Sequence, residues 1–152
     1  MAFTGNYTCD TFKTGLLDGT FDFGTGTTNV FKIALYTNSA TLNQSTAAYT
    51  ATGEVSATGY TAGGEILTIT QVPIIGAPVT GSSSDVAYIS FADATWGPVT
   101  LTARGCLIYK YDGSTNPAVC VLDFGSDKST TNGTFAVQFP SPTNTSAIIR
   151  IS

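Results

Sequence analysis

Carboxylates and cysteines are the side chains of this sequence best suited to acid–base or nucleophilic chemistry, because the chain contains no histidine. Without imidazole, Ser–His and Cys–His pairs cannot form, and the commonest general base and metal ligand is missing. The closest carboxylate pairs, Asp18 with Asp22 and Asp123 with Asp127, lie beside turn glycines or at a strand end. A glycosidase needs two carboxyl groups that face each other across a fixed gap, which spacing alone does not establish. We therefore expect no enzyme, no catalytic residues and no cofactor.

Two motifs have the outline of ligand-binding loops but lack the residues that such loops need. Asp127 to Gly133 has the outline of a calcium loop, yet its glycine comes one place late and Gln138 stands where a bidentate glutamate is required. We expect a solvent-exposed β-turn there and no metal site. Gly24 and Gly63-Gly64 lack the lysine and the strand–loop–helix context of phosphate-binding loops, so we expect them in turns.

The three cysteines, Cys9, Cys106 and Cys120, are an odd number without CxxC spacing. We expect free, buried thiols in a protein made in a reducing cytoplasm, and a Cys106–Cys120 bridge between neighbouring strands stays open as an alternative. The opening residues lack the basic and apolar regions of a signal peptide. No apolar run approaches the roughly 18 residues that a transmembrane helix needs.

The composition favours β-structure and disfavours binding to nucleic acid or membranes. Charged residues make up 11% of the 152 residues, against roughly 25% in an average soluble protein. Threonine, serine and glycine take their place, which is typical of strands and turns. The net charge of −4 argues against a duplex-binding protein, which needs clustered lysine and arginine, and no basic amphipathic segment is present for anionic lipids.

The elements that must position any site follow from hydrophobic spacing. Apolar residues recur at helical intervals between Cys9 and Leu17, and Asp18-Gly19 ends the segment, so a short helix is predicted with Thr8 or Asp10 as its cap. Alternating residues predict strands over the following segments: Val30 to Thr37, Glu65 to Val72 (ended by Pro73), Val86 to Ala92, Trp96 to Thr102, Gly105 to Tyr111, Ala118 to Phe124, Thr134 to Phe139 and Ala147 to Ile151.

These elements predict one all-β domain over residues 1–152: a jelly-roll-like β-sandwich with one short N-terminal helix. Residues 1–29 are expected to form the helix and an arm that packs on the sandwich. Residues 38–64 are expected to form a long loop or arm with a short helical turn near Leu42 to Ala48. The segments 105–111 and 118–124 give the clearest hairpin, and Pro78 and Gly81 to Ser84 mark another loop.

Five stretches carry a more specific pattern: CDTFKTGLLDG at 9–19, FKIALYTNSATL at 31–42, YTATGEV at 49–55 with GYTAGG at 59–64, and ARGCLIY at 103–109. Over residues 9 to 125 the chain resembles a family of small structural proteins of tailed bacteriophages. That family includes capsid cement, or decoration, proteins that clamp neighbouring major capsid subunits. The resemblance implies a virion protein made in the bacterial host cytoplasm and bound to the capsid surface, with the major capsid protein as its partner and a dimer or trimer as its assembly.

The residues expected to contact a partner or a sister copy are apolar and aromatic side chains of the N-terminal segment and of the 38–64 arm. For the side chains of the N-terminal segment, the alternative is that they cover the protein's own core and contact no partner. A tail or tail-fibre component that binds a receptor or glycan, with tyrosines and Trp96 stacking on sugar, is the second functional hypothesis. The candidate contact residues are Phe3, Tyr7, Phe12, Leu16, Leu42, Tyr49 and Tyr60.

Overall fold

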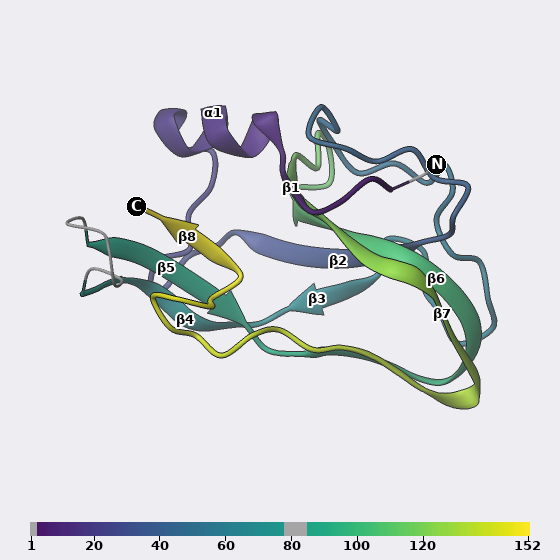
Figure 1. Ribbon diagram of the computed structural model, residues 1–152. Coiled ribbons are helices and arrows are strands. Elements are labelled where there is room, and N and C mark those ends of the chain that lie inside the picture. Colours follow the sequence, from purple (N-terminus) through teal and green to yellow (C-terminus); the bar gives the residue numbers. More distant parts are fainter. Residues whose placement is uncertain (1–2, 78–84) are drawn as a thin grey trace.

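The computed structural model describes residues 3–77 and 85–152, and it forms two open antiparallel sheets arranged like a sandwich, with one short helix (Figure 1). The large sheet has the order β1-β7-β6-β2-β3 and the small sheet the order β4-β5-β8. The predicted all-β sandwich with a short N-terminal helix is confirmed. The elements are β1 (Tyr7–Thr8), α1 (Asp10–Asp18), β2 (Val30–Tyr36), β3 (Glu65–Leu67), β4 (Ile69–Gly76), β5 (Val86–Phe91), β6 (Ala94–Tyr111), β7 (Ala118–Val137) and β8 (Ile149–Ile151).

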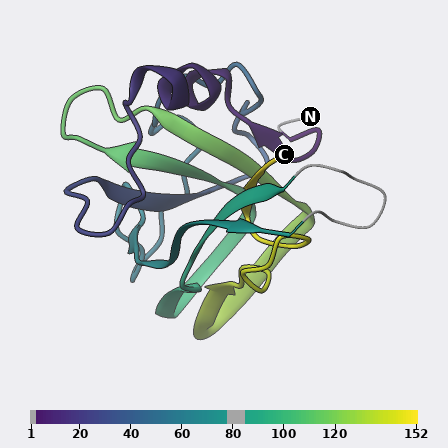
Figure 2. The ribbon, with the colours of Figure 1, turned by 90° about the vertical axis from the view of Figure 1, so that its left-hand side faces the viewer.

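The hairpin of β6 and β7 is the longest feature of the fold. Its strands have 18 and 20 residues, and several register irregularities bend it. The half of the hairpin next to its turn pairs with β1 and β2, and the other half continues away from α1, as both views show (Figure 2). The predicted hairpin around residues 112–117 is therefore confirmed, but the segments predicted separately at 96–102 and 134–139 belong to the same two strands.

The β-turn expected over residues 127–133 is wrong, because this segment lies inside β7. Lys128, Ser129 and Thr130 stand opposite Ala103, Thr102 and Leu101 of β6. Thr102 and Ser129 also share a hydroxyl hydrogen bond at 2.7 Å. Cross-strand pairing therefore overrides the local turn preference of this glycine- and asparagine-containing stretch.

The chain passes between the two sheets along one side of the sandwich. Only Thr68 separates β3 in the large sheet from β4 in the small sheet, and its carbonyl accepts a hydrogen bond from the Ala92 N–H at 2.8 Å. The expectation that Pro73 ends this ladder is wrong. The strand β4 runs through Pro73 because it is an edge strand whose register is irregular between Gln71 and Ile74, where a missing N–H is tolerated.

On the opposite side, β1 is the edge of the large sheet and β8 is the edge of the small sheet. We call this the open side of the sandwich, because within the described residues no strand joins these two edges. The expected loop at Pro78 and Gly81 to Ser84 lies outside the described residues.

The helix α1 is capped differently from the prediction. Cys9 is its N-cap, without a side-chain cap hydrogen bond, and Gly19 ends it in the left-handed conformation with φ +79. Its buried Phe12 packs edge-to-face on Phe21 at 5.1 Å and on Phe23 at 6.0 Å between ring centroids. Phe23 in turn stacks on Phe31 of β2 at 4.4 Å. Phe23 also lies edge-to-face with Phe91 of β5, at 6.2 Å between ring centroids, so an aromatic cluster holds the helix against both sheets.

The 38–64 segment packs along the large sheet and contains no helix, so the helical turn expected near Leu42 is wrong. The Asn43 carbonyl accepts only a single turn hydrogen bond, from the Thr46 N–H at 3.0 Å. Ala48 then forms a bridge to Pro117, which draws the backbone into an extended conformation.

Gly64 should be irreplaceable because its backbone lies directly against β2. Its φ is +70, and an added Cβ would overlap the carbonyl group of Ile33. Gly26 has a similar φ of +79 but open space around it, so an alanine there pays only the cost of the left-handed backbone conformation and meets no neighbouring atom. We expect Gly64→Ala to lower the free energy of unfolding by about 3 kcal/mol or more, and Gly26→Ala by about 1 kcal/mol. Urea denaturation measures both, and equal losses would contradict the close approach.

Candidate functional site

The open side of the sandwich carries two hollows that share Ile148 in their walls. One has a volume of about 600 Å³ and lies between the two halves of β7 and the segment that follows it. The other has a volume of about 730 Å³ and lies between α1 and β8. We call them the aromatic hollow and the helix hollow, and together they form the open-side groove.

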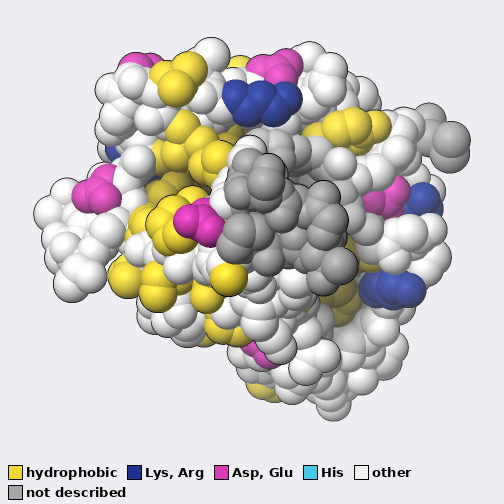
Figure 3. Space-filling view, turned by 60° about the vertical axis from the view of Figure 1, so that its left-hand side comes forward, with side chains coloured by type: hydrophobic (Ala, Val, Ile, Leu, Met, Phe, Trp, Pro, Cys, Tyr) yellow, Lys and Arg dark blue, Asp and Glu magenta, His cyan; other side chains and the backbone are white. Residues whose placement is uncertain are grey.

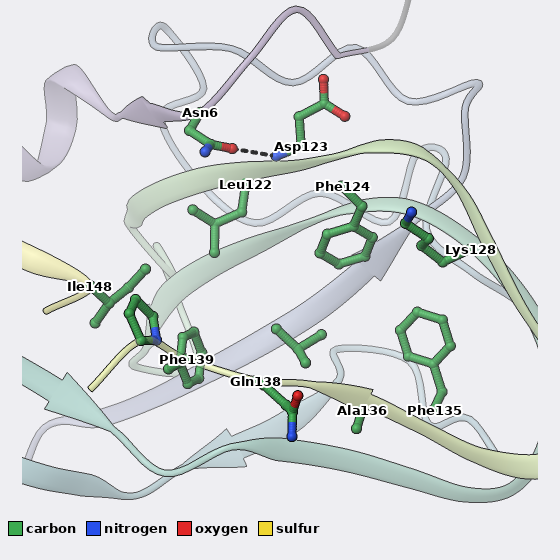
Figure 4. Close-up of a pocket in the computed structure, with 12 residues that line it drawn as sticks. Asn6, Leu122, Asp123, Phe124, Lys128, Phe135, Ala136, Gln138, Phe139 and Ile148 are labelled. Carbon is green, nitrogen blue, oxygen red and sulfur yellow. Dashed lines mark hydrogen bonds between the residues drawn. The ribbon is translucent and has the colours of Figure 1, made fainter. Parts of the chain in front are cut away.

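The aromatic hollow brings together side chains that are far apart in the sequence (Figure 4). Leu122 and Phe124 come from the first half of β7, whereas Phe135 and Phe139 come from its end and from the segment after it. The rings of Phe124 and Phe135 lie 6.3 Å apart. This arrangement is possible because β7 bends in between, where Gly125 has a φ of +76.

Polar groups of the aromatic hollow are largely engaged within the chain. The Asn6 side-chain oxygen accepts a hydrogen bond from the Asp123 N–H at 2.8 Å. The Asp123 carboxylate pairs with the Arg104 Nε at 3.1 Å, and a second guanidinium nitrogen lies 3.8 Å from Asp127. Arg104 therefore lies between the carboxylates of Asp123 and Asp127, and its ion pairs explain why these two acidic side chains lie close together.

The helix hollow is lined mainly by apolar side chains and has cations in its wall. Leu16 and Leu17 come from α1, and Ile149 and Ile151 come from β8. Leu17 is 91% exposed. The two charged side chains in this lining are Lys13 and Arg150, and no aspartate or glutamate is among the lining residues.

An exposed apolar row continues from the helix hollow across the small sheet. Ile75, Ala87 and Ile151 stand opposite one another on β4, β5 and β8 and therefore share one face. Ile75 is 62% and Ile151 52% exposed. Figure 3 shows hydrophobic side chains gathered at this end of the molecule. The small sheet thus presents apolar surface that the protein's own core does not cover.

The structure places the predicted contact residues mostly inside the protein. Phe3 and Phe12 are each 2% exposed, so these two residues lie in the protein's own core, as the alternative interpretation expected. Leu42 and Tyr60 are also buried. Tyr7, Leu16 and Tyr49 are half-buried, and among the seven only Leu16 lines the helix hollow. Contact with a partner stays a prediction for these three residues.

The residues that sequence reasoning missed are Leu17, Ile75, Ile148 and Ile151. Leu17, Ile148 and Ile151 stand in predicted elements, whereas Ile75 lies beyond Pro73, where the predicted strand ended. The exposure of these side chains follows from the order of the strands in the two sheets. Period-two spacing shows which residues share a face of a strand, and it does not show whether that face is covered.

A polar cluster around Glu54 fastens the 38–64 segment to the large sheet. The Glu54 carboxylate accepts hydrogen bonds from the hydroxyls of Tyr49 at 2.6 Å and Tyr60 at 2.8 Å, and from the Gly63 N–H at 2.7 Å. The Tyr60 hydroxyl oxygen also accepts the Leu35 N–H of β2 at 2.9 Å. These tyrosines therefore have structural partners, although sequence alone made them candidates for contact with another molecule.

The remaining candidates for chemistry have structural surroundings. The three cysteines are free and buried, and Cys106 stands opposite Leu122 rather than Cys120. Asp18 and Asp22 each accept hydrogen bonds from their own turns. Trp96 is 2% exposed and packs between Tyr60 and Phe135, so its ring is not accessible for stacking on a sugar.

Two further findings concern the described residues as a whole. Within residues 3–77 and 85–152, no group of three or more histidine, cysteine or acidic side chains is close enough to hold a metal ion. In the same part of the chain, no helix has the length and apolarity needed to cross a membrane.

No protein-family model, curated protein or solved structure matches this chain. The open-side groove is therefore interpreted from its own geometry and chemistry.

The tyrosines around Glu54 predict a loss of stability in alkali. Burial and the nearby Glu54 carboxylate raise the pKa of Tyr109 to about 12, and burial raises the pKa of Tyr36, Tyr49 and Tyr60 further above the usual value. An unfolded chain releases these protons from about pH 10, whereas the folded protein keeps them. The contribution of these tyrosines to stability is therefore complete below pH 10 and falls as the pH rises, by up to about 1.4 kcal/mol per pH unit for each tyrosine.

Absorbance of tyrosinate, followed together with circular dichroism, measures this effect. Ionisation of the four tyrosines should coincide with unfolding, and Tyr109→Phe should reduce the slope between pH 10 and 12. The buried cysteines act in the same direction from about pH 9, since burial raises their pKa as well. Ionisation of these four tyrosines near pH 10 in a protein that stays folded would contradict the prediction.

Proposed function

We propose that this chain is a non-enzymatic structural protein of a tailed-bacteriophage particle, and more specifically a capsid cement protein that binds and stabilises the major capsid shell. The observation that carries the proposal is the exposed apolar surface around the open-side groove, formed by Leu17, Ile75 and Ile151. Contiguous apolar patches on soluble proteins are typical of interaction sites. The resemblance of residues 9 to 125 to phage structural proteins supports a shell protein as the kind of partner.

Two properties of the sequence support a binding role over a catalytic one. The chain has no histidine and only 11% charged residues, so few groups are available for proton transfer. A weakly charged surface also suits the close packing of many copies on a shell, because repulsion between copies is small. A dimer or trimer is the assembly that we propose on the particle.

The groove is well suited to hold a shell protein. Burying one isoleucine or leucine side chain contributes about 1.5–3 kcal/mol, so a few such contacts are enough for stable binding at the high local concentration of a capsid lattice. In this proposal the large sheet provides rigidity, and the apolar end with α1 and the small sheet contacts the shell.

A second candidate is a tail or tail-fibre component that binds a glycan or receptor. The observation that favours it is the aromatic hollow, in which Phe124 and Phe139 are half-buried and Asn6 and Gln138 provide polar groups at the rim. Concave sites with apolar walls and a few polar groups are typical of small ligands.

The experiment that separates the two candidates is the location of the chain in purified virions. Heads and tails are separated and their proteins identified by mass spectrometry, and cryo-electron microscopy of the heads locates the density. We expect the chain in DNA-filled heads, on the outer surface. Its presence only in tails would favour the second candidate, and its absence from both fractions would exclude a virion role.

Charge placed in the apolar row should prevent incorporation without unfolding the protein. We expect Ile75→Asp and Ile151→Asp to reduce the amount of protein bound to heads at least tenfold, because each buries an unpaired carboxylate against the partner. Ile66→Asp is the matched control, since Ile66 is 67% exposed on β3, away from the groove. Quantitative mass spectrometry measures incorporation, and thermal unfolding checks that all three variants are folded. Equal incorporation of the three variants would contradict this surface.

A further inference from the structure

We propose that the helix hollow receives an extended segment of the partner protein, which adds as a strand to the free edge of β8 and carries at least one carboxylate toward Arg150 and Lys13. This inference rests on the proposed partner-binding role of the open-side groove, and it specifies the chemistry of the segment that occupies it.

The free edge of β8 provides the backbone partner. The strand β8 pairs with β5 through Ile149, Arg150 and Ile151, and it has no other neighbour in the described sheet order. An edge strand has unpaired N–H and C=O groups along its outer side, which are a template for another strand. A segment added there would extend the small sheet to the order β4-β5-β8-partner.

The space beside this edge has the shape that an added strand requires. The helix hollow is bounded by residues 147–152 on one side and by α1 on the other, and its volume is about 730 Å³. A strand lying beside β8 would have α1 next to it, so its side chains on that face would meet Leu16 and Leu17. Grooves between a strand edge and a helix combine backbone pairing with apolar contacts at alternate side chains.

The charges of the hollow indicate the sign of the partner segment. Lys13 and Arg150 are two of only six basic residues in a chain of net charge −4, yet both line this hollow without an acidic residue in the lining. The Lys13 ammonium contacts Asp10 at 2.8 Å. The Arg150 guanidinium donates to the Asn144 carbonyl at 3.3 Å, and no salt bridge of the described residues includes it.

The same arginine argues against a second copy of this chain as the occupant. Two β8 strands paired antiparallel about a two-fold axis through Arg150 would place two arginines directly opposite each other, and like charges in that position destabilise a sheet. A partner segment with glutamate or aspartate opposite Arg150 instead forms an ion pair at the rim of the groove.

Synthetic peptides test this chemistry without knowledge of the partner sequence. The first probe is a capped eight-residue peptide that alternates valine with glutamate. The second has lysine in place of glutamate, and the third is the glutamate peptide with N-methyl groups on alternate backbone amides. We expect the glutamate peptide to bind the full-length protein at least about tenfold more tightly than the lysine peptide, with an affinity that falls as salt is added.

Variants of the protein assign the binding to the helix hollow. Arg150→Glu should weaken binding of the glutamate peptide about tenfold and favour the lysine peptide, whereas Lys32→Glu, on β2 of the large sheet and outside the lining of both hollows, should leave both unchanged. N-methylation should abolish binding, because it removes the backbone donors, and the amide hydrogens of residues 149–151 should exchange more slowly in the complex. Circular dichroism checks that both variants are folded.

The inference is overturned if the glutamate peptide does not bind, if charge or N-methylation makes no difference, or if sedimentation shows a dimer of this chain that Arg150→Glu dissociates. The outcome for the proposed function is separate. A chain that is present on DNA-filled heads but binds no acidic peptide keeps its proposed role and loses this docking mode. A chain that is absent from virions but binds the acidic peptide through β8 keeps the docking mode and loses the capsid role.

Discussion

The fold depends on one constraint: the short connections from β3 to β4 and from β5 to β6 hold the two sheets together along one side, whereas on the other side no described strand lies between β1 and β8. Thr68 carries the chain from β3 to β4, and its hydrogen bond with Ala92 ties the return connection to the same side. A sandwich buries its inner faces only where the sheets overlap or where another element covers them. The joined side therefore closes the core, while the edges β1 and β8 stay apart on the other side. The open-side groove and the exposed row from Ile75 to Ile151 both follow from this asymmetry.

Contacts within the chain fasten both the 38–64 segment and α1 to the large sheet. Glu54 gathers two tyrosine hydroxyls and a backbone N–H, which ties the long 38–64 segment to β2. The aromatic cluster of Phe12, Phe23 and Phe31 holds α1 in the same way. Because these contacts are satisfied within the chain, the small sheet can present apolar side chains without the loss of the fold. Rigid support beside a partly uncovered sheet is the arrangement expected of a protein that binds through preformed surface.

The sequence was a good guide to local structure and a poor guide to exposure. Alternation predicted β2 and the β6–β7 hairpin, because period-two patterns and the turn at 112–117 are local signals. The strand through Pro73 and the strand over residues 127–133 could not be found in this way, since a bulge and cross-strand pairing override local preference. The burial of Phe3 and the exposure of Ile75 depend on which strands become neighbours in the sheets. The spacing of apolar residues along the sequence does not determine that order. Contact with a partner stays a prediction for the half-buried Tyr7, Leu16 and Tyr49, and of these three only Leu16 lines the helix hollow.

An added strand would change the protein as well as anchor it. The three residues of β8 have one sheet neighbour, so this edge has fewer contacts than the central strands and should open more easily. A segment that pairs with β8 only in the folded state would stabilise the fold by mass action. The same segment would cover Leu17 and Ile151, whose exposure otherwise favours association with other apolar surfaces. Binding at the open side would therefore complete the sandwich, and the sparse charges at its rim would contribute orientation more than affinity.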